Sequence, residues 1–109
     1  MTPQDQELMF MLSEEAGEVT QAIGKLLRHG PRSFHPNKPA EDNKAALLRE
    51  ITDFMAIYYL AQAAGFLPII QSRHVFIAMK RKQEWMKYPN GLRSAVGMID
   101  NPLQMPEAL

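Results

Sequence analysis

Apolar side chains recur near the start of the chain at the spacing of a single helix face. The series runs Leu8, Leu12, Val19, Ala22 and Leu26, and its steps alternate between four and three residues if position 15 fills the gap. Such steps return to one side of an α-helix, so the pattern predicts an amphipathic helix. Position 15 is a glutamate, which places a charged residue in an otherwise apolar line.

Both ends of this first helix carry sequence signals. Thr2 is expected to cap it, Pro3 to occupy its first helical position and Asp5 to complete a capping box. Gly30 and Pro31 then end the helix. Residues 30–41 (GPRSFHPNKPAE) contain three prolines and predict a loop.

Two more helices are predicted after this loop. The apolar series of the second is Leu47, Ile51, Phe54, Tyr58 and Ala61. This helix should begin near Asp42 or Asn43 and run to about Ala64, with Gly65 ending it. A third helix is expected from near Pro68 to about Tyr88, where Pro89-Asn90-Gly91 stops it.

No segment alternates polar and apolar residues as a half-buried strand does, so the fold class is all-α. We expect an antiparallel helical bundle with three main helices per chain, completed by oligomerisation. Residues 1–91 would form the helical domain and residues 92–109 a C-terminal tail, for which packing on a partner subunit is one role. The apolar surface of residues 54–60 is too extensive for one small chain to bury, which favours a homodimer or tetramer.

Composition narrows the functional classes. The chain of 109 residues has 12 lysines and arginines against 12 aspartates and glutamates, so nothing in its charge favours a nucleic-acid polymer as partner. It contains no cysteine, which excludes disulfides and thiolate metal sites. The N-terminus lacks the features of a secretory signal, and polar and helix-breaking residues interrupt the apolar stretch 51–70. We therefore expect a soluble cytoplasmic protein with no membrane partner.

Acidic residues occupy positions where a core is expected. Glu15 fills a core position of the first helix, and Glu18 follows three residues later on nearly the same face. Asp53 lies among apolar residues in the second helix, and Glu50 precedes it by three residues. Carboxylates in such surroundings are costly unless they are paired or bind a metal. Two pairs that face each other would favour Mg²⁺, with Mn²⁺ as a substitute.

Purely structural roles for these acids stay open. Glutamates three residues apart are common on solvated helix faces, Arg49 could form an ion pair with Asp53, and Lys25 and Arg28 could neutralise other acids. A di-iron site is rejected, because neither Glu15 nor Glu50 is followed three residues later by histidine. The three histidines, His29, His35 and His74, are not spaced as metal ligands are, and they are expected in loops or on the surface. His29 and His35 could still touch a bound substrate.

Two short segments resemble a known family. The segment Ser13-Glu14-Glu15-Ala16-Gly17-Glu18, followed by Arg49-Glu50-Ile51-Thr52-Asp53, resembles the EExxE…ExxD signature of the MazG-like nucleoside triphosphate pyrophosphohydrolases. The resemblance covers roughly residues 8–88. The chain departs from the family pattern in two ways that bear on the identity of the substrate. Little sequence precedes the first motif, and the connecting loop is long and rich in proline.

The resemblance implies an α-helical, magnesium-dependent enzyme that converts a nucleoside triphosphate to a monophosphate and pyrophosphate. Glu15, Glu18, Glu50 and Asp53 would hold the metal. Glu14 would support the site, and either Glu14 or Glu15 would accept a proton from the attacking water. Family members typically assemble as dimers or tetramers. Two alternatives stay open: a phosphoribosyl-ATP pyrophosphohydrolase, and a non-enzymatic helical oligomerisation module that binds a structural cation.

Cationic side chains are the candidates for binding substrate. In the third helix Lys82 falls in a gap of the apolar line Val75, Met79 and Met86, so its ammonium is expected to reach toward the acids, with Lys80 and Arg81 beside it. Lys25 and Arg28 of the first helix are further candidates. The loop 30–41 could close over the nucleotide, and Phe34 or the Trp85 of a neighbouring chain could stack on the base.

Overall fold

The computed structural model describes residues 1–92. These contain three helices: α1 (Pro3–His29), α2 (Asn43–Ala63) and α3 (Ser72–Gln83). The one β-type contact among them is an isolated bridge between Phe34 and Asp42. The prediction of an all-α fold with three main helices is therefore confirmed for the described part of the chain.

The predicted ends of α1 and α2 agree with the structure. The Asp5 amide donates to the Thr2 hydroxyl at 3.1 Å, and the Thr2 amide donates to the Asp5 carboxylate at 2.9 Å, which is the expected capping box. Gly30 ends α1 with a positive φ of 88°. Asp42 caps α2 by accepting the Ala45 amide at 2.8 Å.

The third helix is shorter than predicted. It begins at Ser72 rather than near Pro68, and it ends at Gln83 rather than near Tyr88. The β-branched residues Ile69 and Ile70 are weak helix formers, and Gln71 before the helix is extended and offers no side-chain cap. Beyond Gln83 the backbone continues in turns, in which the Met86 amide bonds the Gln83 carbonyl at 3.1 Å.

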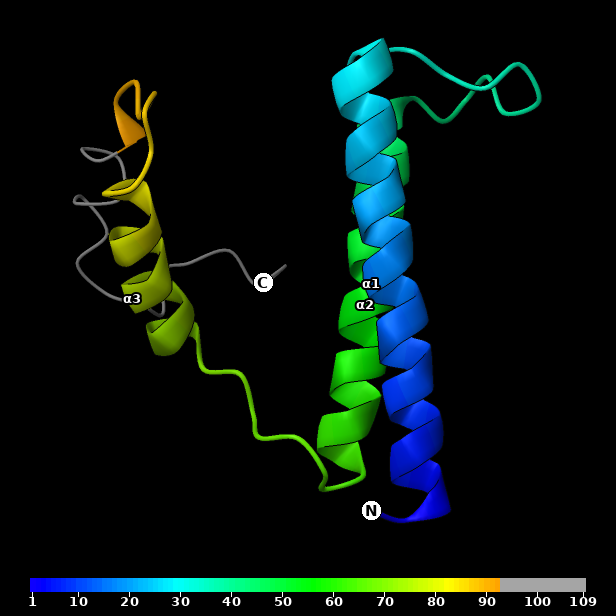
Figure 1. Cartoon of the computed structure of the whole chain (residues 1–109), viewed down its shortest axis with the longest axis vertical. Coiled ribbons are helices and arrows are strands. Elements are labelled where there is room, and N and C mark those ends of the chain that lie inside the picture. The colour runs from blue at the N-terminus through cyan, green and yellow to red at the C-terminus, as the bar shows by residue number, and fades with distance from the viewer. Residues whose placement is uncertain (93–109) are drawn as a thin grey trace. The chain divides into compact units, whose positions relative to one another are not determined.

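The helices α1 and α2 form an antiparallel hairpin, with residues 30–42 connecting them at one end (Figure 1). Its small apolar core consists of Leu8, Ile57 and Ala61, packed against Met9, Leu12 and Leu67. Leu8 lies early in α1 while Ile57 and Ala61 lie late in α2, so this core is at the end of the hairpin away from the loop. Nearer the loop, the interface between the two helices also contains a polar side chain, because the buried Glu50 lies in the first half of α2.

The helix face that α2 turns toward α1 includes Ala61, as predicted, but it departs from the prediction at Ile51. Ile51, which the pattern placed on the inner face, is 42% exposed, whereas its neighbour Glu50 is buried. The inner face therefore follows Glu50, Ile57 and Ala61, the three buried residues of the helix. A carboxylate thus occupies an inner position on both helices, Glu15 on α1 and Glu50 on α2.

The chain divides into two compact units, Met1–Pro68 and a second unit that begins at Ile69 and contains α3. Among the described residues, no helix is both long and apolar enough to cross a membrane. Residues 93–109, nearly all of the predicted tail, lie outside the described part, so a role in packing on a partner stays a prediction.

Candidate metal centre

Three carboxylates from the two helices of the hairpin converge. Glu15 of α1 and Glu50 and Asp53 of α2 each offer an oxygen, and these oxygens all lie within 4.8 Å of one another. The spacing of three residues places Glu50 and Asp53 about one helical turn apart on α2. We call these three residues the carboxylate cluster.

Burial within the carboxylate cluster differs from the sequence-based expectation. Asp53 was expected among apolar side chains, but it is exposed, and Glu50 is the buried member with only 9% of its surface accessible. Glu15 is half-buried. Near the loop, the face of α2 toward α1 passes through Glu50 rather than Ile51, so Glu50 is the buried carboxylate.

Two oxygens of the cluster are buried without a hydrogen-bond partner among the described residues: Glu15 Oε2 and Glu50 Oε2. A buried acceptor without a partner is costly, more so when it carries charge. Oxygen ligands from several carboxylates are what Mg²⁺ and Mn²⁺ bind. The residues present therefore fit a divalent cation, and the cluster could hold one.

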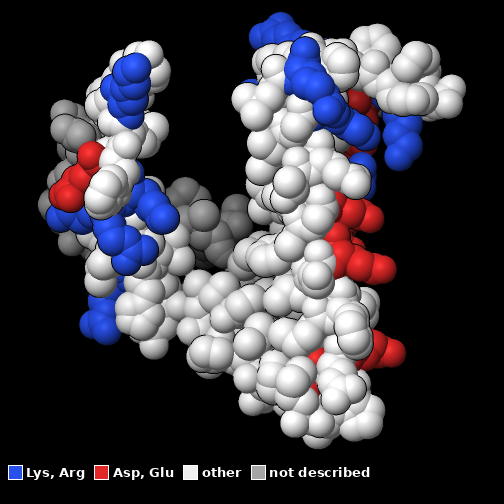
Figure 2. Space-filling model, in the orientation of Figure 1, with Lys and Arg blue, Asp and Glu red and all other residues white. Residues whose placement is uncertain are grey.

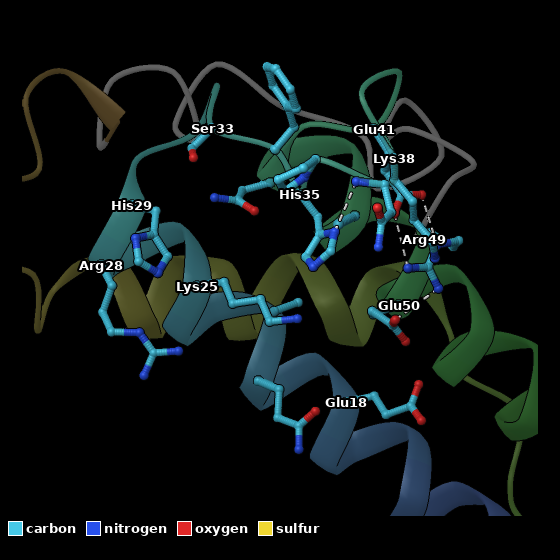
Figure 3. A pocket seen from close by; sticks show the side chains of 17 residues that line it. Glu18, Lys25, Arg28, His29, Ser33, His35, Lys38, Glu41, Arg49 and Glu50 are labelled. Atoms are coloured by element: carbon cyan, nitrogen blue, oxygen red, sulfur yellow. Dashed lines mark hydrogen bonds and ion pairs between the residues drawn. The ribbon is translucent and has the colours of Figure 1, made fainter.

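Glu18, the fourth predicted ligand, adjoins the cluster. The pKa of its carboxyl is raised above the ordinary 4.5, first by its close side-chain contact with Glu50, then by the charges of Glu50 and Glu15. The charge of Glu14 raises the pKa of Glu18 slightly further, while the Glu14 side chain itself is exposed. Figure 3 shows the carboxyl groups of Glu18 and Glu50 directed toward one another. Like charges crowd together here, and a bound cation would relieve their repulsion.

Arg49 does not pair with Asp53, the partner that the sequence suggested. Its guanidinium makes two contacts with Glu41, from Nε at 2.9 Å and Nη2 at 3.2 Å, and Nη1 donates to Glu50 Oε1 at 2.8 Å. The expected ion pair with Asp53 does not form among the described residues. The paired guanidinium lowers the pKa of Glu41. Asp53 therefore keeps its charge available to the cluster.

A cavity of about 630 Å³ adjoins the cluster at the loop end of the hairpin. Glu18 and Glu50 line it, and so do four cationic side chains: Lys25, Arg28, Lys38 and Arg49. The imidazoles of His29 and His35 and the ring of Phe34 complete much of its wall. Figure 2 shows the same division on the surface of the hairpin, with acids along one side and cations gathered near the loop. The cavity thus joins an acidic end to a basic one.

The loop forms one wall of this cavity and is tied to the start of α2. The Asn43 amide donates to the Ser33 carbonyl at 2.9 Å, and the Asn43 side chain donates to the Gly30 carbonyl at 2.9 Å. The Lys44 amide donates to the Pro31 carbonyl at 3.1 Å. The sequence indicated a loop that could cover a ligand and a His35 that could touch it, but not that Lys38 would line a cavity with α1. The positions of the prolines in the sequence do not indicate how the loop packs against α1.

The predicted cations fall into two groups. Lys25 and Arg28 line the cavity beside the carboxylate cluster. Lys80, Arg81 and Lys82 lie in the last turn of α3, within the second unit, where the Lys80 ammonium lies 5.6 Å from the centre of the Phe76 ring. Trp85 is 83% exposed in the same unit. Contacts of these side chains with a nucleotide therefore stay predictions.

Comparison of the chain with models of protein families, with curated proteins and with solved structures finds no match in any of the three. The geometry of the hairpin and the motif resemblance in the sequence are consequently the basis for proposing a function.

Proposed function

We propose that this protein is a magnesium-dependent nucleoside triphosphate pyrophosphohydrolase of the MazG-like kind, which converts a nucleotide to its monophosphate and pyrophosphate. The observation that carries the proposal is the carboxylate cluster: three acids from two helices, with two buried oxygens that lack partners among the described residues. A cavity lined by cations opens beside it. A metal–triphosphate complex needs both features next to one another.

The metal ligands in this proposal are Glu15, Glu18, Glu50 and Asp53. Glu15 and Glu50 lie between the helices of the hairpin, whereas Glu18 and Asp53 approach from its exposed edges. Bound Mg²⁺, or Mn²⁺ in its place, would supply positive charge to the phosphoryl oxygens and to the leaving pyrophosphate. Arg49 orients the Glu50 carboxylate for this role by binding Oε1, which leaves Oε2 for the metal.

The remaining side chains bind and orient the substrate. Lys25 and Arg28 offer charge to the phosphates from the wall of the cavity. Either Glu14, which is exposed, or the neighbouring Glu15 accepts the proton of a water that attacks the α-phosphorus. Phe34, which also lines the cavity, offers a ring on which a base can stack.

The test is a panel of ribo- and deoxyribonucleoside triphosphates, with phosphoribosyl-ATP included, incubated with the full chain and Mg²⁺. We expect pyrophosphate and a monophosphate, loss of turnover when a chelator removes the metal, and loss of turnover in Glu50→Gln. Glu7→Gln is the matched control, because Glu7 is an exposed acid of α1 outside the cluster. Orthophosphate with a diphosphate product would overturn the reaction, and an inert protein that still binds Mg²⁺ would favour a structural cation site.

A further inference from the structure

The cavity follows one face of α1. Its lining residues on that helix are Glu18, Gln21, Ala22, Lys25, Arg28 and His29. The others lie three, four, seven, ten and eleven residues after Glu18, which continues the helix face on which Glu15 lies. From Glu18 to His29 the helix rises by about 16 Å, at about 1.5 Å per residue. The cavity is therefore elongated, and it suits a ligand that is longer than a single phosphate.

Charge changes along this length. Glu18 and Glu50 mark one end, and Figure 3 shows Arg28 and His29 well removed from them, with Lys25 between. Arg49 is occupied by its contacts with Glu41 and Glu50. Lys25, Arg28 and Lys38 make no ion pair with any described residue, so their charges are available to an anion in the cavity.

His35 adds a hydrogen-bond donor from the loop. Its Nδ1 accepts the Asn37 amide at 3.1 Å, so the neutral ring carries its proton on Nε2. The ring points into the cavity (Figure 3). Backbone bonds fix the loop on either side, from the Lys38 amide to the His35 carbonyl at 2.8 Å and from the Glu41 amide to the Lys38 carbonyl at 3.1 Å. The donor is thus held in place before a ligand arrives.

We propose that Lys25, His35 and Lys38 form a polyphosphate-binding subsite, and that the triphosphate lies lengthwise along α1. This proposal rests on the proposed function. The α-phosphorus lies at the carboxylate cluster, and the β- and γ-phosphates, which leave as pyrophosphate, extend along α1 past Lys25 toward Arg28. The hairpin's own loop supplies two of the three phosphate-binding side chains. The α3 cations, which the sequence favoured for this role, are not required for it.

The experiment uses inorganic pyrophosphate as the probe, titrated calorimetrically into the full chain in the presence of Mg²⁺. Lys25→Ala, His35→Ala and Lys38→Ala should each weaken binding by about tenfold or more, because each removes a donor to a charged phosphate. Arg32→Ala is the matched control: Arg32 is an exposed cation of the same loop, but it does not line the cavity. It should bind pyrophosphate like the wild type, and circular dichroism should show all four variants folded.

The outcomes separate this inference from the reaction. If the three variants lose pyrophosphate binding while the wild type hydrolyses no nucleotide, the subsite stands and the proposed reaction fails. If the wild type hydrolyses nucleotides and the three variants bind pyrophosphate like Arg32→Ala, the subsite is overturned and the reaction stands. Loss of binding in Lys82→Ala alone would also overturn it, since the phosphates would then belong to α3.

Discussion

Arg49 holds one oxygen of Glu50 at 2.8 Å, while the other oxygen of the same carboxylate is buried without a partner among the described residues. The two residues are adjacent on α2, yet their other contacts differ. Arg49 also binds Glu41 at the end of the loop, and Glu50 faces Glu15 across the hairpin. The buried charge is therefore only half compensated in the metal-free protein. This imbalance is the source of the first two predictions.

Glu50→Gln should stabilise the metal-free protein and remove its response to magnesium. Repulsion from Glu15 and Asp53 disappears, which should outweigh a weaker contact with the half-exposed Arg49. We expect a gain on the order of 1 kcal/mol, or a few degrees in Tm. The wild type should gain about 2.7 kcal/mol at a hundredfold excess of Mg²⁺ over its Kd, and the variant little. Thermal unfolding with and without Mg²⁺ measures both effects.

Asp53→Asn is the companion variant. Because Asp53 is exposed, its replacement should change metal-free stability little, yet it should weaken Mg²⁺ binding and turnover. Loss of helix by circular dichroism in both variants would mean that these acids hold the fold together, and the metal assignment would fail.

Stability of the metal-free protein should fall as pH rises, through Glu18. The pKa of Glu18 is raised by its contact with Glu50 and by the charges of Glu50 and Glu15. The folded state then binds more protons than the unfolded state between the ordinary pKa of 4.5 and the raised value, so stability is lost as pH rises through that window. Glu18→Gln should remove this loss and raise Tm at neutral pH, with little effect at about pH 4. A Tm difference independent of pH would contradict the crowding of Glu18 and Glu50.

The sequence predicted the helices, and much of the cluster, for a physical reason. Glu15 interrupts an apolar line with a strict period, so its inward placement followed directly from the pattern. On α2 nearly every position from Ile51 to Leu60 is apolar, which gives no contrast between faces and hid the burial of Glu50. The cavity depends on how a loop rich in proline folds back on α1, and such packing has no period to detect.

Assembly is the next prediction. Large apolar side chains are exposed on both helices of the hairpin, including Phe10 at 75% and Leu27 at 78% on α1, and Leu48 and Leu60 on α2. We expect a homodimer or a dimer of dimers that covers them. Leu27→Asp and Leu60→Asp should shift the mass toward that of a monomer in light scattering. A wild-type monomer at micromolar concentration would contradict the prediction.

The basic turn of α3 provides a separate prediction. Lys80 already lies over the Phe76 ring, whereas Lys82 occupies the gap in the apolar line of the helix. Lys82→Ala should raise KM for the nucleotide by about tenfold, as loss of one charge-assisted contact of about 1–3 kcal/mol implies, and it should leave pyrophosphate binding at the polyphosphate-binding subsite unchanged. Lys80→Ala and Arg81→Ala are the controls. A wild-type KM in Lys82→Ala together with a defect in either neighbour would contradict the choice of Lys82 among the three cations of α3.

If the carboxylate cluster directs water to the α-phosphorus, the oxygen of that water ends in the monophosphate product. It can be followed by hydrolysing a nucleotide from the active panel in ¹⁸O-enriched water with Mg²⁺ and resolving the products by mass spectrometry. We expect one ¹⁸O atom in the monophosphate and none in the pyrophosphate, with no labelled product from Glu50→Gln. Label in pyrophosphate or orthophosphate, or unchanged labelling by Glu50→Gln, would show that the cluster does not carry out this reaction.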